Sequence, residues 1–187
     1  NAFWCPFKSY DCPKPNVMVF GPGYAGAIDI VAHEMVHGII QHEANLIYSD
    51  EPGAVNEALA DIFAVLIEFY ARSGRGNWLI GEDAPGFSTE RPLRDLAHPN
   101  LTNEAGTVIF DPNQRFSSVN RGQPSHYGEV VRPTDPICAS TWLNDNGCVH
   151  FNSGILNKFA HLIAEGGEHR GTQVKGIGLA KLGRLTY

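Results

Sequence analysis

Apolar side chains recur at helical spacing in three stretches of the 187-residue chain. The first covers residues 28–43, and the second runs from about Gly53 to Arg72. In both, apolar residues return every three or four positions, as on the buried face of an amphipathic helix. The third stretch, Ser153 to Glu165, is followed by Gly166-Gly167, a typical helix stop. The pattern therefore predicts three helices.

The other segments predict short strands, turns and irregular structure. Residues 1–25 indicate short strands and turns, because the apolar run Val17-Met18-Val19-Phe20 is broken by Gly21-Pro22-Gly23. A loop is expected over 45–52. From Ser73 to Val149 the chain is rich in Gly, Pro, Asn and Ser and shows no long periodic segment. So long an irregular region is either functional or a sign that some elements escape the pattern.

Composition indicates a globular protein with a sizeable core. The hydrophobic content is 43%, and 187 residues suit one domain or two small lobes. A membrane span is not expected, because the chain has no apolar run of about 18 residues. The net charge of −6 comes without a basic cluster, which argues against nucleic acid and anionic membranes as partners.

The four cysteines fall into two pairs that are local in sequence, Cys5 with Cys12 and Cys138 with Cys148. Neither pair has the C-x-x-C spacing of a zinc ribbon or redox site, so two disulfides are expected. Other connectivities, or four reduced cysteines, stay open. Disulfides and the sequon Asn100-Leu101-Thr102 favour an extracellular, secreted protein, whose signal peptide would lie upstream of the first residue.

The first predicted helix carries the motif His33-Glu34-Met35-Val36-His37. Residues four apart lie on the same face of a helix, so both imidazoles point the same way. Zinc takes nitrogen and oxygen donors in a tetrahedral shell, and a catalytic site leaves one position for water. Glu34 follows the first histidine directly and is a candidate general base. A five-residue motif also occurs by accident, so a third ligand is needed.

The third ligand distinguishes between families of zinc enzymes. A motif that continues H-x-x-G-x-x-H would need Gly at position 40 and His at position 43, where the sequence has Ile40 and Glu43. The second predicted helix instead carries Glu57 and Asp61 on one face. Unpaired buried carboxylates are costly. Glu57 as a zinc ligand and Asp61 as the acceptor for a zinc-bound histidine would satisfy both.

With these residues the sequence resembles the thermolysin-type neutral metallopeptidases, the gluzincins with a His-His-Glu site. The resemblance rests on the motif of residues 33–37, on the segment from Gly53 to Asp61, and on the run from Asp145 to Lys158. It implies an α+β fold with a zincin-like catalytic core, in which a short β region is followed by a mainly helical lobe. The active-site helix lies between them, and the catalytic zinc is bound by His33, His37 and Glu57.

The resemblance also implies how the chain is divided. Residues 1–27 would be the remnant of a β-rich upper lobe, 28–43 the active-site helix, and 44–187 a mainly helical lower lobe that lacks the family's C-terminal helices. The chain is then a fragment, an incompletely sequenced protein or a compact variant. A missing lobe would expose apolar surface, which a partner chain or an oligomer would cover.

The resemblance also implies functional roles for residues at matching positions. Tyr48 and His150 match donors to the oxyanion of the tetrahedral intermediate, and Asp145 matches the carboxylate that orients that histidine. Asn56 and Asp61 match the partners of the two zinc-bound imidazoles, one for His37 and one for His33.

Substrate contacts follow from the same resemblance. Asn1 and Ala2 open an edge strand that pairs with the substrate backbone. Arg94 matches the arginine that holds the substrate carbonyl on the leaving side. The pocket for the residue after the cut corresponds to Ile30, Ile80 and Leu93, which predicts cleavage before Leu, Phe, Ile or Val.

A calcium site is the second metal prediction. Asp29, Glu68, Asn77 and Glu82 fall at or near the positions of the family's acidic calcium site, and oxygen donors suit that ion. Asn77 and Leu79 replace acidic ligands, which favours one calcium over two. The alternative is a set of surface carboxylates without an ion.

These features predict a secreted zinc metalloendopeptidase that hydrolyses peptide bonds on the amino side of hydrophobic residues, by Glu34-assisted attack of zinc-bound water. Its partners are peptide or protein substrates. One alternative is a non-catalytic secreted effector or binding protein on a peptidase scaffold, and another is a structural zinc protein. Intact ligands, base and oxyanion donors argue against the first, and a site with only three protein ligands argues against the second.

Overall fold

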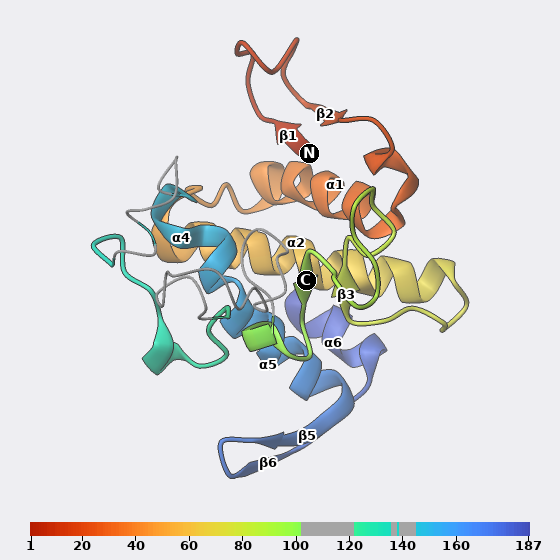
Figure 1. Cartoon of the computed structure of the whole chain (residues 1–187), viewed down its shortest axis with the longest axis vertical. Helices are drawn as coiled ribbons and strands as arrows, with labels where there is room; N and C mark the ends of the chain where they lie inside the picture. Colours follow the sequence, from red (N-terminus) through yellow and green to blue (C-terminus); the bar gives the residue numbers. More distant parts are fainter. Residues whose placement is uncertain (102–121, 136–137, 139–144) are drawn as a thin grey trace.

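The computed structural model describes residues 1–101, 122–135, 138 and 145–187. Thr102 of the sequon lies outside these residues. Two long helices, α1 (Ile28–Glu43) and α2 (Asp50–Ala71), lie side by side and form the centre of the molecule (Figure 1). The predicted bounds of the first helix are confirmed. The second begins three residues earlier than Gly53, because two acidic residues and a proline suit the first turn of a helix.

The main hydrophobic core fills the space between α1, α2 and the C-terminal helices. Many of its residues are alanines, which let helix backbones approach closely. The fully buried members outside the long helices include Ile80, Leu96 and Leu182. This packing makes the two long helices the rigid base on which the candidate site is built.

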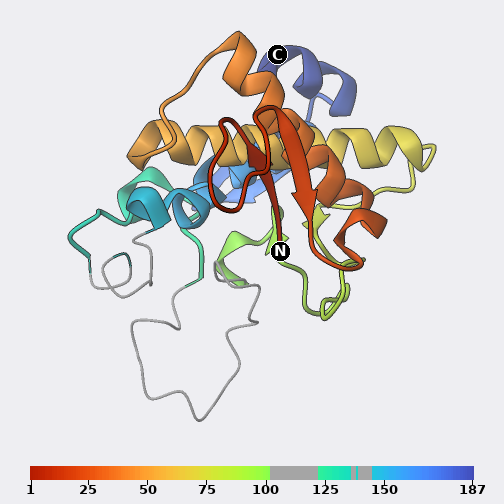
Figure 2. The same ribbon diagram turned by 90° about the horizontal axis from the view of Figure 1, so that it is seen from above.

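In the described part of the chain the strands form three separate antiparallel pairs, so the fold is α+β as predicted. The first pair lies on the side of α1 away from α2 (Figures 1 and 2). The pairs are β1 (Ala2–Cys5) with β2 (Val17–Phe20), β3 (Leu79–Ile80) with β4 (Arg94–Asp95), and β5 (Gly166–His169) with β6 (Thr172–Lys175). Short 3-10 helices are η1 (Tyr24–Gly26), η2 (Pro99–Leu101) and η3 (Tyr127–Glu129).

Among the described residues of the C-terminal part, the further helices are α4 (Asp145–Asn152), α5 (Gly154–Glu165) and α6 (Leu179–Thr186). The predicted third helix corresponds to α5, which ends at Glu165 and is followed by Gly166 with φ of 80°. The pattern does not predict β5, β6 or α6, and it assigns the start of α4 to irregular structure. Residues 146–148 have positive φ there, so the usual helical periodicity is absent.

Close contacts between the start of α2 and the start of α4 depend on two glycines. A Cβ on Gly147 would lie 2.3 Å from Asp50 Oδ1, and one on Gly53 would lie 2.4 Å from Val149 Cγ1. Ser49 Oγ also donates to the carbonyl of Asn146 at 3.1 Å. These contacts hold residues 49–53 beside residues 146–149.

The structure contains the two predicted disulfides, Cys5–Cys12 and Cys138–Cys148. Cys5, Cys138 and Cys148 are fully buried. The first disulfide closes a loop at the end of β1, and the second joins α4 to the segment before it. In the part of the chain that the structure describes, no helix is long and apolar enough to cross a membrane.

Candidate metal centre and active site

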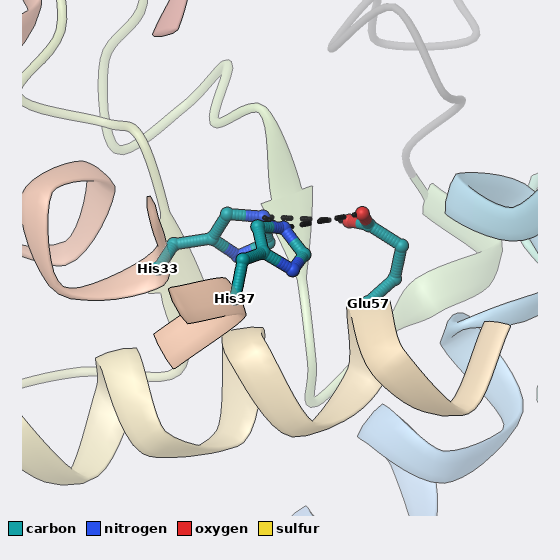
Figure 3. A group of neighbouring side chains, drawn as sticks. All are labelled: His33, His37 and Glu57. Carbon is teal, nitrogen blue, oxygen red and sulfur yellow. Dashed lines mark hydrogen bonds and ion pairs between the residues drawn. The ribbon is translucent and has the colours of Figure 1, made fainter. Parts of the chain in front are cut away.

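Three predicted zinc ligands converge between α1 and α2 (Figure 3). The Nε2 atoms of His33 and His37 lie 3.0 Å apart. The two carboxylate oxygens of Glu57 lie 3.4 Å from His33 Nε2 and 3.3 Å from His37 Nε2. Around zinc, bonds of about 2.0–2.1 Å place neighbouring tetrahedral donors roughly 3.3 Å apart. The three donor atoms therefore have the spacing of one face of a zinc tetrahedron.

The chemistry of these donors also fits a cation. Two ring nitrogens face each other beside Glu57, which is fully buried and whose Oε2 has no hydrogen-bond partner in the described residues. Burial opposes the ionised carboxylate, but His150 and His37 lower the pKa of Glu57 well below its usual value. Among residues 1–101, 122–135, 138 and 145–187, this is the one His, Cys, Asp and Glu group whose ligand atoms converge.

Each imidazole is oriented through its second nitrogen. His37 Nδ1 lies 2.8 Å from Asn56 Oδ1, and His33 Nδ1 lies 2.9 Å from Asp61 Oδ1. An acceptor at Nδ1 keeps the proton there and leaves the Nε2 lone pair free to face a metal. The structure thus brings Asn56 and Asp61 to the atoms where the sequence predicts imidazole partners.

Asp61 also connects the centre to the core. Arg94 donates to it through Nε at 2.7 Å and through Nη2 at 2.6 Å, and Asn157 Nδ2 donates at 2.8 Å. Burial opposes ionisation of Asp61, but Arg94 and His33 lower its pKa below the usual range. Arg94 is only 3% exposed and does not line the cleft described below. The contacts in this structure make it a partner of Asp61, whereas the sequence predicts a substrate contact.

Tyr48 and His150 lie beside the same centre and line the same cleft. The Tyr48 hydroxyl donates to Glu57 and lies 3.4 Å from His150 Nε2, which is itself 3.3 Å from Glu57 Oε2. Burial and the charge of Glu57 raise the pKa of Tyr48, so the hydroxyl keeps its proton. Both groups can therefore act as hydrogen-bond donors at the centre.

Asp145 holds His150 at two points. Its Oδ1 lies 2.6 Å from His150 Nδ1, and its Oδ2 accepts the backbone N–H of His150 at 3.0 Å. Burial lowers the pKa of His150, but Glu57 and Asp145 outweigh it and raise the pKa overall. The imidazole is thus held with its Nε2 directed at Glu57.

A cleft of about 590 Å³ opens over the metal centre. Asn1 and Ala2, at the start of β1, line the cleft, and so does Glu34 beside the two histidines. The full lining is Asn1, Ala2, Phe3, Trp4, Pro6, Phe7, His33, Glu34, His37, Gln41, Tyr48, Asn56, Glu57 and His150. The cleft is thus shared by the predicted metal ligands, the predicted base and the edge of β1.

The predicted specificity pocket forms an apolar group next to this centre. A Cβ on Gly81 would meet Leu93 Cβ at 3.0 Å and Ile30 Cδ1 at 3.3 Å, so both side chains pack on this glycine. Ile80 is adjacent in sequence, and its carbonyl accepts from Leu93 N at 2.8 Å. The structure brings Ile30, Ile80 and Leu93 together in and against the core, but none of them lines the cleft.

The four predicted calcium ligands come from the start of α1, the end of α2 and the segment around β3, and the carboxylate oxygens of Asp29, Glu68 and Glu82 do not converge as the zinc-ligand atoms do. Asp29, Glu68 and Glu82 are buried, and Asn77 Nδ2 donates to Glu82 Oε1 at 2.6 Å. Glu68 Oε2 and Glu82 Oε2 have no hydrogen-bond partner in the described chain. Burial and Glu82 raise the pKa of Glu68 to about 7. Arg72, which pairs with Glu68 at 3.0 Å, already supplies one positive charge to the cluster.

Sequence reasoning misses several residues of the site. Gln41 lines the cleft and follows His37 by one helical turn, so its spacing could have indicated it. Asn157 donates to Asp61 from α5, and no local pattern links residues so far apart. Pro6 and Phe7 line the cleft from the disulfide loop, which has no periodic signal.

The fold and the site together define the class. An α+β chain in which H-E-x-x-H on one helix meets a buried glutamate on the next has the arrangement of a glutamate-liganded zinc metallopeptidase core. A profile of the thermolysin metallopeptidase α-helical domain matches residues 44–187. The chain belongs to the thermolysin metallopeptidase family.

Individual relatives agree with this assignment. The chain is 36% identical over 194 residues to a thermolysin of Alicyclobacillus acidocaldarius subsp. acidocaldarius, covering 100% of this chain and 29% of that protein. It is 37% identical over 194 residues to a bacillolysin of Bacillus cereus, covering 100% of this chain and 28% of the relative.

A solved structure is also similar. The precursor of protealysin, a metalloproteinase from Serratia proteamaculans, aligns with a TM-score of 0.60 and 28% identity, over 87% of this chain and 45% of that one. The chain thus spans less than a third of the length of the curated relatives named above and less than half of this structure.

Proposed function

We propose that this chain is a zinc metalloendopeptidase that acts on peptide or protein substrates. The convergence of His33, His37 and Glu57 at the floor of a cleft that Glu34 lines is the observation that carries the proposal. Two disulfides support an extracellular, secreted location, because such bonds persist in oxidising compartments.

Zinc bound by the three ligands would supply a Lewis acid for the scissile carbonyl and would lower the pKa of a water molecule to about 7. Glu34 takes the proton from the attacking water and returns it to the leaving amine. Tyr48 and His150 donate hydrogen bonds to the oxygen that becomes negative in the transition state, which lowers the barrier of the chemical step. Asp145 keeps the His150 donor directed at that oxygen.

The proposed substrate contacts lie partly in the cleft and partly in the buried groups beside it. The free edge of β1 at Asn1 and Ala2 pairs with the substrate backbone by strand addition. Ile30, Ile80 and Leu93 accept the hydrophobic residue after the cut, once side chains at the cleft floor move to admit it. Arg94, which is buried on Asp61 in this structure, holds the substrate carbonyl on the leaving side once the residues that cover it move.

Casein hydrolysis tests the proposal directly. The zinc-loaded protein should release peptides, a zinc chelator should stop release, and added zinc should restore it. Metal content measured on the same samples distinguishes loss of zinc from loss of fold. A folded, zinc-loaded protein without hydrolytic activity would leave a non-catalytic binding protein as the better interpretation.

The oxyanion role of Tyr48 predicts a defined kinetic loss. Tyr48→Phe removes the hydroxyl and should lower kcat by roughly 10²–10³-fold with a small change in KM, because this donor acts mainly in the transition state. Stopped-flow or steady-state assays with a quenched fluorescent peptide measure both constants. Tyr10→Phe is the matched control, since Tyr10 is fully exposed on the disulfide loop. A Tyr48→Phe enzyme with full zinc and unchanged kcat would remove Tyr48 from the mechanism.

We also propose one structural calcium ion bound by Asp29, Glu68, Asn77 and Glu82. The two buried carboxylate oxygens without partners support a cation there. Calcium at a hundred times its Kd should stabilise the fold by about 2.7 kcal/mol and raise Tm by roughly 5–10 °C. Glu68→Gln should abolish this rise, whereas Glu43→Gln, at an exposed position on α1, should keep it. An equal Tm with calcium and with chelator would mean that Arg72 alone neutralises the cluster.

A further inference from the structure

The loop closed by Cys5–Cys12 presents an apolar surface at one end of the cleft. Pro6 and Phe7 belong to this loop and line the cleft. Phe7 is 68% exposed, although removing a large apolar side chain from water is favourable. An exposed aromatic ring on the wall of a binding cleft is typical of a contact surface for a ligand.

The loop is joined to the rest of the hairpin by its disulfide and by backbone hydrogen bonds. Cys5 is fully buried and Cys12 is 7% exposed, so the disulfide is covered. The backbone N–H of Asn16 donates to the Cys5 carbonyl at 2.7 Å, and that of Ser9 donates to the Cys12 carbonyl at 3.0 Å. A contact held in place before binding loses less entropy when a ligand arrives. Phe7 therefore reaches the cleft from a loop that is crosslinked and hydrogen-bonded before a ligand binds.

Trp4 joins this loop to the active-site helix. Its Nε1 donates to Gln41 Oε1 at 2.6 Å, and a Cβ on Gly38 would lie 2.9 Å from its ring, so the indole packs directly on α1. Gln41 follows His37 by four residues, which is about 6 Å along the helix axis. Trp4 and the loop beyond it are thus displaced from the metal centre in one direction along α1.

The proposed pocket for the residue after the cut lies in the other direction. Ile30 precedes His33 on α1, whereas Gln41 follows His37, so the metal ligands separate the two ends. The loop therefore meets residues on the amino side of the cut. A strand advances about 3.3 Å per residue, so an offset of 6 Å or more corresponds to the second or third residue before the cut.

We infer that Pro6 and Phe7 form an apolar subsite, which selects a large apolar side chain, aromatic rings above all, two or three residues before the scissile bond. This inference rests on the proposed peptidase activity and adds to it a specificity on the amino side. Phe3, Trp4, Pro6 and Phe7 are all uncharged, so a charged side chain there would lose water without gaining an ionic partner. Ring-on-ring contact adds attraction for Phe, Tyr or Trp.

Quenched fluorescent peptides that share a Gly-Leu cut bond test the subsite. They carry Phe, Ala or Glu at the second or third position before the cut and Ala elsewhere. The native protein should show a kcat/KM about tenfold higher for the Phe peptide than for the Ala peptide. Phe7→Ala should bring this ratio close to one. Phe7→Lys should raise the Glu-to-Phe ratio about tenfold, a change of preference that simple damage to the fold would not give.

Tyr10→Ala is the matched control, because Tyr10 belongs to the same disulfide loop but does not line the cleft. Its Phe-to-Ala ratio should equal that of the native protein. Cleavage of all peptides with a ratio that Phe7→Ala leaves unchanged would overturn the subsite and leave the peptidase proposal standing.

If the zinc-loaded protein cleaves none of the peptides, the peptidase proposal fails, and calorimetric binding of the same peptides decides the subsite. Tighter binding of the Phe peptide that disappears in Phe7→Ala would support it as a binding pocket. Equal binding of the Phe and Ala peptides by the native protein would overturn it.

Discussion

Replacing Glu34 with glutamine should lower kcat/KM for peptide hydrolysis by roughly 10²–10⁴-fold while the protein keeps its zinc. Glu34 lines the cleft next to the histidine ligands, and glutamine has almost the same shape but cannot accept the proton of the attacking water. The side chain is not one of the three converging ligand atoms, so the metal site should survive. Zinc content, measured by atomic absorption alongside the kinetics, distinguishes the two effects.

Glu43→Gln provides the control for this substitution. Glu43 ends the same helix and is exposed, so the same chemical change there should leave kcat/KM within about twofold of the native value. A Glu34→Gln protein that retains more than a tenth of native activity would contradict the general-base role. Loss of zinc together with activity would assign Glu34 to metal binding instead.

The helices of this fold could be predicted because their signal is local. Residues 28–43 carry an apolar face at helical spacing, and α1 has those bounds. The predicted start of α2 is three residues too late. The first turn is polar, so it lacks the apolar periodicity on which the prediction rests, and only its acidic residues and proline mark it as helical. Helix α4 could not be found, because its first turn runs through left-handed residues that are held by contacts with the segment before α2.

In the candidate site, too, residues placed by local spacing could be predicted, whereas residues brought together by distant contacts could not. His33, His37 and Glu57 follow from spacing on two helices and from the cost of a buried carboxylate. The roles of Tyr48, Asp145 and His150 come from the resemblance alone, because these residues meet only through the packing of α2 against α4. The contact of Arg94 with Asp61 joins β4 to α2, and the sequence predicts a substrate contact for this arginine. Phe7 lies in a loop whose composition carries no functional signal.

Asp61→Ala should lower the free energy of unfolding of the zinc-free protein by about 3–5 kcal/mol. The carboxylate is fully buried and accepts two hydrogen bonds from Arg94, at 2.7 and 2.6 Å. Removing it leaves a buried guanidinium without its anionic partner, in an environment where an unpaired charge is costly. Urea unfolding in the presence of a zinc chelator measures this loss without a contribution from the metal.

The double variant Asp61→Leu/Arg94→Met distinguishes the structural role of Asp61 from its role at the metal. Both charges are then gone, so most of the stability should return, because apolar residues of similar size replace buried ion pairs at little cost. Zinc affinity should nevertheless stay 10–100-fold below that of the native protein, an order of magnitude typical for the loss of a partner of a metal-bound imidazole. His33 Nδ1 has lost the acceptor 2.9 Å away, and the leucine cannot replace it. Recovery of both stability and zinc affinity would show that Asp61 acts only in packing, whereas recovery of stability alone would make it the residue that orients His33.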